Sequence, residues 1–158
     1  MKHWIWLRVA AVLQAVGTFL HTMATASGTA SGSAAPGPAE QAVLAAMRGF
    51  HFNIMGSTRS VYDFYRGYEF SMTVVFAVLA VLMWQLSNLS RTEPRRALPL
   101  IVTILVCTLL LDVLSWADFF AGPGVMSALI SVCLAIALLT SYRSSLTESV
   151  GARQVGAG

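Results

Sequence analysis

The chain has 158 residues, of which 56% are hydrophobic and only 11% are charged, and its formal net charge is +3. A soluble domain carries about 25% charged residues, so this composition excludes a globular protein with an ordinary polar surface. The basic residues are dispersed and form no recognition motif, so we expect no nucleic-acid partner. The composition indicates an integral membrane protein whose first partner is the lipid bilayer.

Four apolar segments predict four transmembrane helices, at about residues 4–25, 57–89, 98–120 and 125–142. Each is long enough for a hydrocarbon core of ~30 Å, which takes about 20 helical residues. The runs are continuous and rich in Ala and Leu, which favours helices over barrel strands. The predicted fold class is therefore all-α, a polytopic membrane four-helix bundle. We expect a single domain over residues 1–146 and a flexible tail over 147–158.

The connection between the first two helices divides into two parts. Residues 26–39 consist mainly of Ala, Ser, Gly and Pro, which predicts a flexible loop. In residues 40–55, apolar side chains recur at helical spacing, namely Val43, Met47, Phe50 and Ile54. This pattern predicts a short amphipathic helix at the membrane interface. Gly56 is expected to end it, and Ser57 or Ser60 to cap the following helix.

The distribution of Lys and Arg predicts the orientation. The loop at 91–96 holds three arginines, and basic residues also flank the first and last helices. The positive-inside rule places both termini and this loop in the cytoplasm, N-in and C-in, in the inner or plasma membrane of the cell. The stretch Ala24-Thr25-Ala26 also fits a signal-peptide cleavage site. The sequence leaves open whether the first helix is retained or cleaved.

An alternating series of charges occupies the outer part of the second helix: Arg59, Asp63, Arg66 and Glu69. Helical spacing puts them on one broad face with three potential ion pairs. An unpaired charge at a helix centre costs about 2.5–3.5 kcal/mol, so charges from several helices in one leaflet predict an outward-opening polar pocket or a salt-bridge cluster between helices one to three. The candidate ligand-binding residues are His21, Asp63, Arg66, Glu69, Asp112 and Trp116.

Metal and cofactor chemistry have little support in the sequence. His21, Glu69 and Asp112 could form a histidine–carboxylate set, but each comes from a separate helix and no local pair such as E-x-x-H accompanies them. We expect no metal and no cofactor. The usual hydrolase and nucleotide-binding signatures are also missing, so no catalytic residue is assigned.

Residues 55–89 resemble a family of small bacterial four-helix membrane proteins without an established activity. The resemblance rests on the pattern M-G-x-x-R-S-x-x-D-F-x-x-G, here Met55, Gly56, Arg59, Ser60, Asp63, Phe64 and Gly67, followed by Trp84-Gln85-Leu86. His21-Thr22, at the end of the first helix, is similar to that family as well. The resemblance implies the four-helix topology. EXPERA-type proteins, which bind amphiphiles in an intramembrane cavity, and DoxX-like proteins are looser architectural analogies.

Three functions stay open at this point. The first is a binding protein that holds a lipid or small amphiphile in the outer-leaflet pocket. The second is an accessory or structural subunit of a larger membrane complex, or a homo-oligomer, because small residues on helices one and four permit close helix approach. The third is an intramembrane isomerase-like enzyme that uses Glu69 or Asp112 as acid or base.

Overall fold

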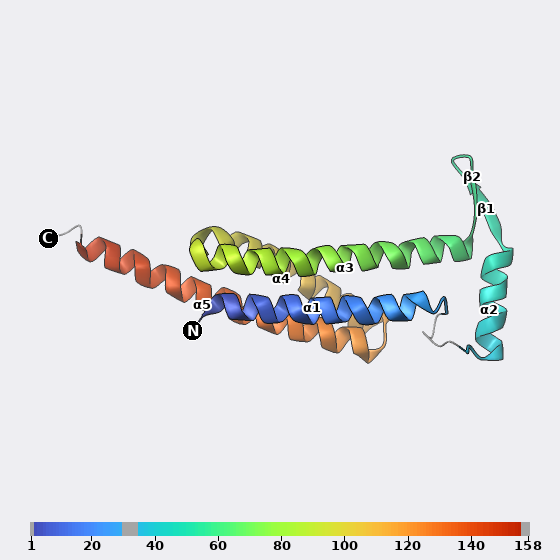
Figure 1. Cartoon of the computed structure of the whole chain (residues 1–158), viewed down its shortest axis with the longest axis horizontal. Coiled ribbons are helices and arrows are strands. Elements are labelled where there is room, and N and C mark those ends of the chain that lie inside the picture. The colour runs from blue at the N-terminus through green and yellow to red at the C-terminus, as the bar shows by residue number, and fades with distance from the viewer. Residues whose placement is uncertain (1, 30–34, 156–158) are drawn as a thin grey trace. The chain divides into compact units, whose positions relative to one another are not determined.

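The structure is a computed structural model that describes residues 2–29 and 35–155, with side chains to residue 144. Its elements are α1 (His3–Ala26), α2 (Pro38–Gly49), β1 (His51–Ile54), β2 (Ser57–Ser60), α3 (Val61–Thr92), α4 (Pro94–Asp118) and α5 (Ala121–Val155) (Figure 1). Four of them, α1, α3, α4 and the first part of α5, are long and apolar enough to cross a membrane. The predicted all-α membrane fold is confirmed, and the chain is a multi-pass membrane protein.

The chain falls into two compact units, and both α1 and α3 contribute to each of them. Unit 1 comprises residues 1–17 and 78–158, and unit 2 comprises residues 18–77. The prediction of a single domain over residues 1–146 stays a prediction.

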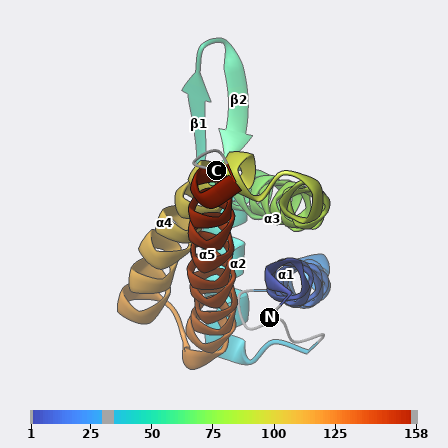
Figure 2. The same cartoon turned by 90° about the vertical axis from the view of Figure 1, so that its left-hand side faces the viewer.

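Unit 1 is a helical bundle in which α4 and α5 pack side by side (Figure 2). Its core draws on all four of its helices: Leu7, Ala10, Ala11, Met83, Leu86, Ala97, Ile101, Ile130, Cys133, Leu134 and Ala137. The alanines matter because small side chains let helix backbones approach closely, and close packing holds helices together in lipid. Gly17 serves the same purpose, since a Cβ there would meet Met126 Cγ at 3.4 Å.

Two boundaries in unit 1 differ from the predicted ones. α4 begins at Pro94 rather than near residue 98, because proline is favoured in the first helical turn, where its missing N–H costs nothing. α5 continues to Val155, so most of the predicted flexible tail at 147–158 is helical. Residues 156–158 of that predicted tail lie outside the described residues.

In unit 2, the predicted interfacial helix is shorter than expected and a β-hairpin follows it. α2 begins at Pro38 and ends at Gly49, and residues 51–60 form two antiparallel strands that pair Ile54 with Ser57 and His51 with Ser60. The prediction of a helix over residues 40–55, and of a second helix from residue 57, is wrong over this stretch. Part of the predicted loop at 26–39, residues 30–34, lies outside the described residues.

The hairpin forms because its two-residue turn, Met55-Gly56, has positive φ at both positions, 53° and 80°. Two positive φ values define a turn whose twist matches that of the flanking strands. Gly56 adopts this conformation without cost, whereas Met55 is strained by its Cβ. Phe52 on β1 then meets Phe64 on α3 edge-to-face, with ring centres 6.4 Å apart.

A reciprocal cap starts α3. Ser60 Oγ accepts a hydrogen bond from the Asp63 N–H at 3.0 Å, and Asp63 Oδ2 accepts one from the Ser60 N–H at 2.9 Å. The pair satisfies two backbone donors at the start of the helix, as a capping box does. The prediction that Ser60 could cap this helix agrees with the structure.

Candidate functional site

The charged series of unit 2 does not lie on one helix face: Arg59 belongs to β2, and the other three residues divide between two faces of α3. Successive steps of three residues, from Asp63 to Arg66 and on to Glu69, each rotate the side chain by about −60° around the helix, so Asp63 and Glu69 point in different directions. Among the residues with described side chains, the series forms one ion pair, Arg66 Nη1 to Glu69 Oε2 at 3.9 Å. The predicted three ion pairs along a single face are therefore wrong.

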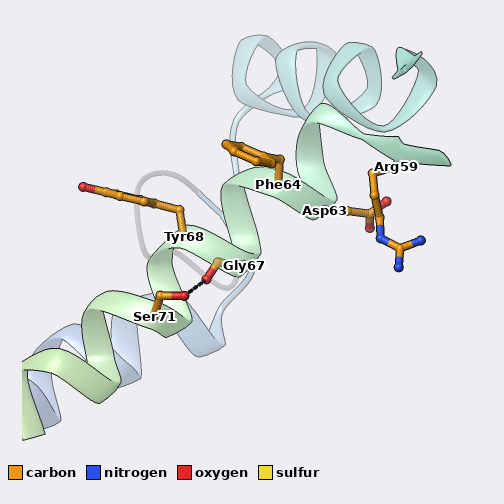
Figure 3. Close-up of a pocket in the computed structure, with 6 residues that line it drawn as sticks. All are labelled: Arg59, Asp63, Phe64, Gly67, Tyr68 and Ser71. Carbon is orange, nitrogen blue, oxygen red and sulfur yellow. Dashed lines mark hydrogen bonds between the residues drawn. The ribbon is translucent and has the colours of Figure 1, made fainter. Parts of the chain in front are cut away.

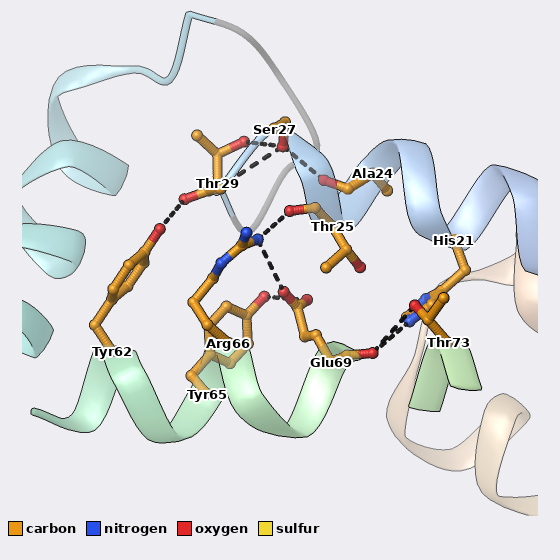
Figure 4. A network of polar contacts seen from close by, with 11 residues as sticks. His21, Ala24, Thr25, Ser27, Thr29, Tyr62, Tyr65, Arg66, Glu69 and Thr73 are labelled. Carbon is orange, nitrogen blue, oxygen red and sulfur yellow. Dashed lines mark hydrogen bonds and ion pairs between the residues drawn. The ribbon is translucent and has the colours of Figure 1, made fainter. Parts of the chain in front are cut away.

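Arg66 faces α1 and holds its C-terminal end (Figure 4). Its Nη1 donates a hydrogen bond to the Thr25 carbonyl, and the side chain of Tyr62 donates one to the Gly28 carbonyl at 3.0 Å. Carbonyls in the last turn of a helix lack intrahelical donors, and a cation there also complements the helix dipole. The guanidinium lies over the Phe70 ring, 4.6 Å from its centre. Arg66 therefore caps α1 from a neighbouring helix, and Tyr62 holds the turn that follows α1.

Glu69 is engaged through both its side chain and its backbone (Figure 4). Tyr65 donates its hydroxyl proton to Glu69 Oε1 at 2.6 Å. The Glu69 carbonyl accepts from Thr73 Oγ1 at 3.3 Å and from His21 Nε2 at 3.2 Å, in the tautomer that carries the proton on Nε2. His21 also meets the Phe76 ring edge-on at 5.4 Å. The structure thus brings His21, Arg66 and Glu69 together, and their contacts tie α1 to α3.

The opposite face of α3 carries an open groove of about 420 Å³. It is lined by Arg59, Asp63, Phe64, Gly67, Tyr68 and Ser71 (Figure 3). Gly67 makes the hollow, because no atom lies within 4 Å of where its Cβ would be. Phe64 and Tyr68 border the groove and are 67% and 58% exposed.

At the charged end of the groove, Arg59 and Asp63 have hydrogen-bonding groups beyond those used in their described contacts. Arg59 Nη1 donates to its neighbour's carbonyl, that of Thr58, at 3.0 Å, which leaves most of its five N–H donors unused. Asp63 uses one oxygen for the cap of α3, and a carboxylate has about four acceptor sites. A guanidinium and a carboxylate that both retain free sites therefore line the same groove.

Asp112 and Trp116, the other two predicted ligand-binding residues, belong to unit 1 and contact α5. Ser127 donates its hydroxyl proton to Asp112 Oδ1 at 2.7 Å. The Trp116 indole covers Gly124, where a Cβ would lie 2.7 Å from Trp116 Cε2. Both contacts join α4 to the beginning of α5.

Sequence reasoning missed the groove residues Phe64, Gly67, Tyr68 and Ser71 as a binding surface, although it selected Asp63. The available signal was the four-residue spacing of Asp63, Gly67 and Ser71, which places them in one row along a helix. Within the described residues, no three His, Cys, Asp or Glu side chains are grouped so as to hold a metal ion.

Comparison of the chain with protein-family models, with curated proteins and with solved structures found no match. The resemblance of residues 55–89 to a bacterial membrane protein family, and the two architectural analogies, stay predictions.

Proposed function

We propose that the protein is a membrane-embedded binding protein for a lipid or small amphiphile, whose head group lies in the groove at the beginning of α3. The observation that supports this most directly is an opposite-charge pair, Arg59 and Asp63, in a groove bordered by exposed aromatic rings. The volume of about 420 Å³ falls within the range of small-molecule sites, about 300–1,000 Å³.

The two charges suit a zwitterionic head group that carries a phosphate and an ammonium. A guanidinium binds phosphate oxygens through charge-assisted hydrogen bonds, so Arg59 takes the phosphate. Asp63 takes the ammonium through its unused acceptor sites. The Tyr68 ring, which is exposed beside the groove, can add a cation–π contact.

The apolar part of the amphiphile follows α3 away from the charges. The groove runs from Asp63 past Gly67 to Ser71. The Ser71 hydroxyl donates to the Gly67 carbonyl at 2.8 Å, so its proton is already satisfied where an alkyl chain would pass. Phe64 and Tyr68 flank this path. We expect neighbouring lipid molecules of the bilayer to cover the open side of the groove.

The contacts of His21, Arg66 and Glu69 support the site by fixing the helix that carries it. A binding surface built on a rigid element is more precise than one on a mobile loop, and α3 is held on its other face through Tyr62, Arg66 and the Glu69 carbonyl. By the positive-inside rule, the groove opens in the outer leaflet of the cell membrane.

Binding is tested by native mass spectrometry of the full chain after gentle extraction, with phosphatidylethanolamine as the probe. Gly67→Leu fills the groove. Arg59→Gln with Asp63→Asn removes its charges, while the amide oxygen that replaces the carboxylate can still accept the Ser60 N–H. Gly49→Leu is the matched control, since the space at its Cβ is equally empty but lies outside the groove.

We expect the groove variants to lose at least about tenfold in retained lipid, and Gly49→Leu to retain it. Equal retention in all variants refutes the binding site. If a protein partner co-extracts in stoichiometric amount and Gly67→Leu releases it, the accessory-subunit function would be supported in place of lipid binding.

A further inference from the structure

A second charged cluster lies in unit 1, where the first turns of α1 pack against the last turns of α3. His3 Nε2 donates to the Ser90 carbonyl at 2.6 Å. Arg8 donates from Nε to Ser87 Oγ at 3.4 Å and from Nη2 to Asn88 Oδ1 at 3.3 Å. These contacts fix the Arg8 guanidinium in one place between the two helices.

Two tryptophans enclose that guanidinium. Arg8 Cζ lies 4.8 Å from the centre of the Trp4 ring and 4.9 Å from that of Trp84. Arg91 Cζ lies 5.0 Å from the same Trp4 ring. Two cations therefore share one indole and are within roughly 10 Å of each other, close to the Debye length of about 8 Å at physiological salt. At that separation like charges repel, more so where water is partly excluded.

Within the part of the chain whose side chains are described, no carboxylate forms an ion pair with Arg8 or Arg91. Among the residues whose side chains the structure describes, the ion pairs are Arg66–Glu69 and Arg96–Glu93. The contacts of Arg8 are with a hydroxyl, an amide and two indoles, and that of Arg91 is with an indole. The cluster thus carries two positive charges and retains N–H donors for an anion.

We propose that Arg8 and Arg91, with Trp4 and Trp84, bind the phosphate of an anionic phospholipid. Guanidinium groups bind phosphate in bidentate geometry, and tryptophan prefers the level of the lipid head groups. Trp84 is 45% exposed, and its apolar neighbours Val81 and Leu82 are also exposed on this membrane-spanning helix, which gives the acyl chains a surface to follow. A lipid of net negative charge is favoured over a zwitterionic one, because no carboxylate among the described side chains pairs with these arginines. This site is independent of the groove on the other unit.

The test uses the full chain in mild detergent, with phosphatidylglycerol, phosphatidylcholine and inorganic phosphate as separate probes in native mass spectrometry. The variant is Arg8→Gln with Arg91→Gln. The control, Arg95→Gln with Arg96→Gln, removes the same formal charge near the connection between α3 and α4, where Arg96 pairs with Glu93 at 2.6 Å. Because an arginine near an anionic lipid surface contributes about fivefold to affinity, the double variant should weaken phosphatidylglycerol binding by about 25-fold, with little change in the control.

Equal losses in variant and control would overturn the proposal, because they would show attraction to overall charge. Equal binding of phosphatidylcholine and phosphatidylglycerol would also overturn it, as would displacement of lipid by millimolar phosphate, which indicates a site for a free anion. If the double variant does not fold, Arg91→Gln alone decides the question, since Arg91 is exposed and its described contact is with Trp4. It should still bind phosphatidylglycerol about fivefold more weakly, and unchanged binding would refute the role of Arg91.

Discussion

Replacing Arg66 by methionine tests whether α3 holds the C-terminal end of α1. The change removes the hydrogen bond from the guanidinium to the Thr25 carbonyl, which lies in a residue that is only 2% exposed. A hydrogen bond that involves a charged group contributes about 1.5–3 kcal/mol, whereas hydrogen bonds between membrane helices average about 0.6 and reach about 1.7 kcal/mol. The Gly28 N–H still donates to the Thr25 carbonyl at 3.1 Å, so no buried acceptor is left without a donor.

The loss of the favourable charge at the helix C-terminus adds about 0.3–1 kcal/mol, and the partly exposed Glu69 pair at 3.9 Å adds little. We therefore expect Arg66→Met to lower the free energy of unfolding by about 1–2 kcal/mol, measured by SDS titration in mixed micelles with far-UV circular dichroism. Arg59→Met is the control, expected to cost under about 0.5 kcal/mol, because Arg59 is exposed and bonds to the adjacent Thr58 carbonyl. Equal effects of the two changes would refute the role of Arg66.

Three further changes test other contacts in the same unfolding assay. Asp112→Leu removes the shorter of the two hydrogen bonds open to the Ser127 hydroxyl, which keeps the Gly124 carbonyl at 3.1 Å, and should cost about 0.5–1 kcal/mol. Asp112→Asn, which still accepts the shorter bond, should cost less; the reverse order would contradict the contact. Gly124→Ala places a Cβ against the Trp116 ring and should cost about 1–3 kcal/mol, with a shift in tryptophan emission as a second readout, and an unchanged spectrum with unchanged stability would count against the packing. Met55→Asn should raise stability by about 0.5–1 kcal/mol, because asparagine tolerates positive φ in this turn; a loss would argue against the turn.

The four membrane helices could be predicted because hydrophobicity in runs of about 20 residues is a strong signal that does not depend on tertiary contacts. The hairpin could not be predicted as easily. Its turn, Met55-Gly56, lacks the Asn-Gly or Asp-Gly pair that usually marks such turns. Phe50 and Ile54 also continue the helical spacing of the residues before them, so periodicity alone favoured the wrong element.

The candidate site was predictable in part. An unpaired ionisable side chain inside a membrane is costly in free energy, so the selection of Arg66 and Glu69 followed from this cost alone. The partner of Arg66 did not, because Thr25 contributes its backbone carbonyl, and every residue type has one. Asp63 and Glu69 point in different directions because two steps of three residues rotate the side chain around the helix axis. This rotation is overlooked when the charges are treated as one broad face.

The hydrogen bond between Asp112 and Ser127 has a consequence for how the chain enters the membrane. Asp112, the acceptor, precedes Ser127, the donor, by 15 positions. When α4 reaches the translocon during synthesis, Ser127 has therefore not yet arrived to hydrogen-bond the Asp112 carboxylate. α4 and α5 are separated by only two residues, 119 and 120, too few to let one helix enter lipid and settle without the other. Synthesis thus favours joint release of the two helices as a hairpin, in which the charge and its donor leave the aqueous channel together.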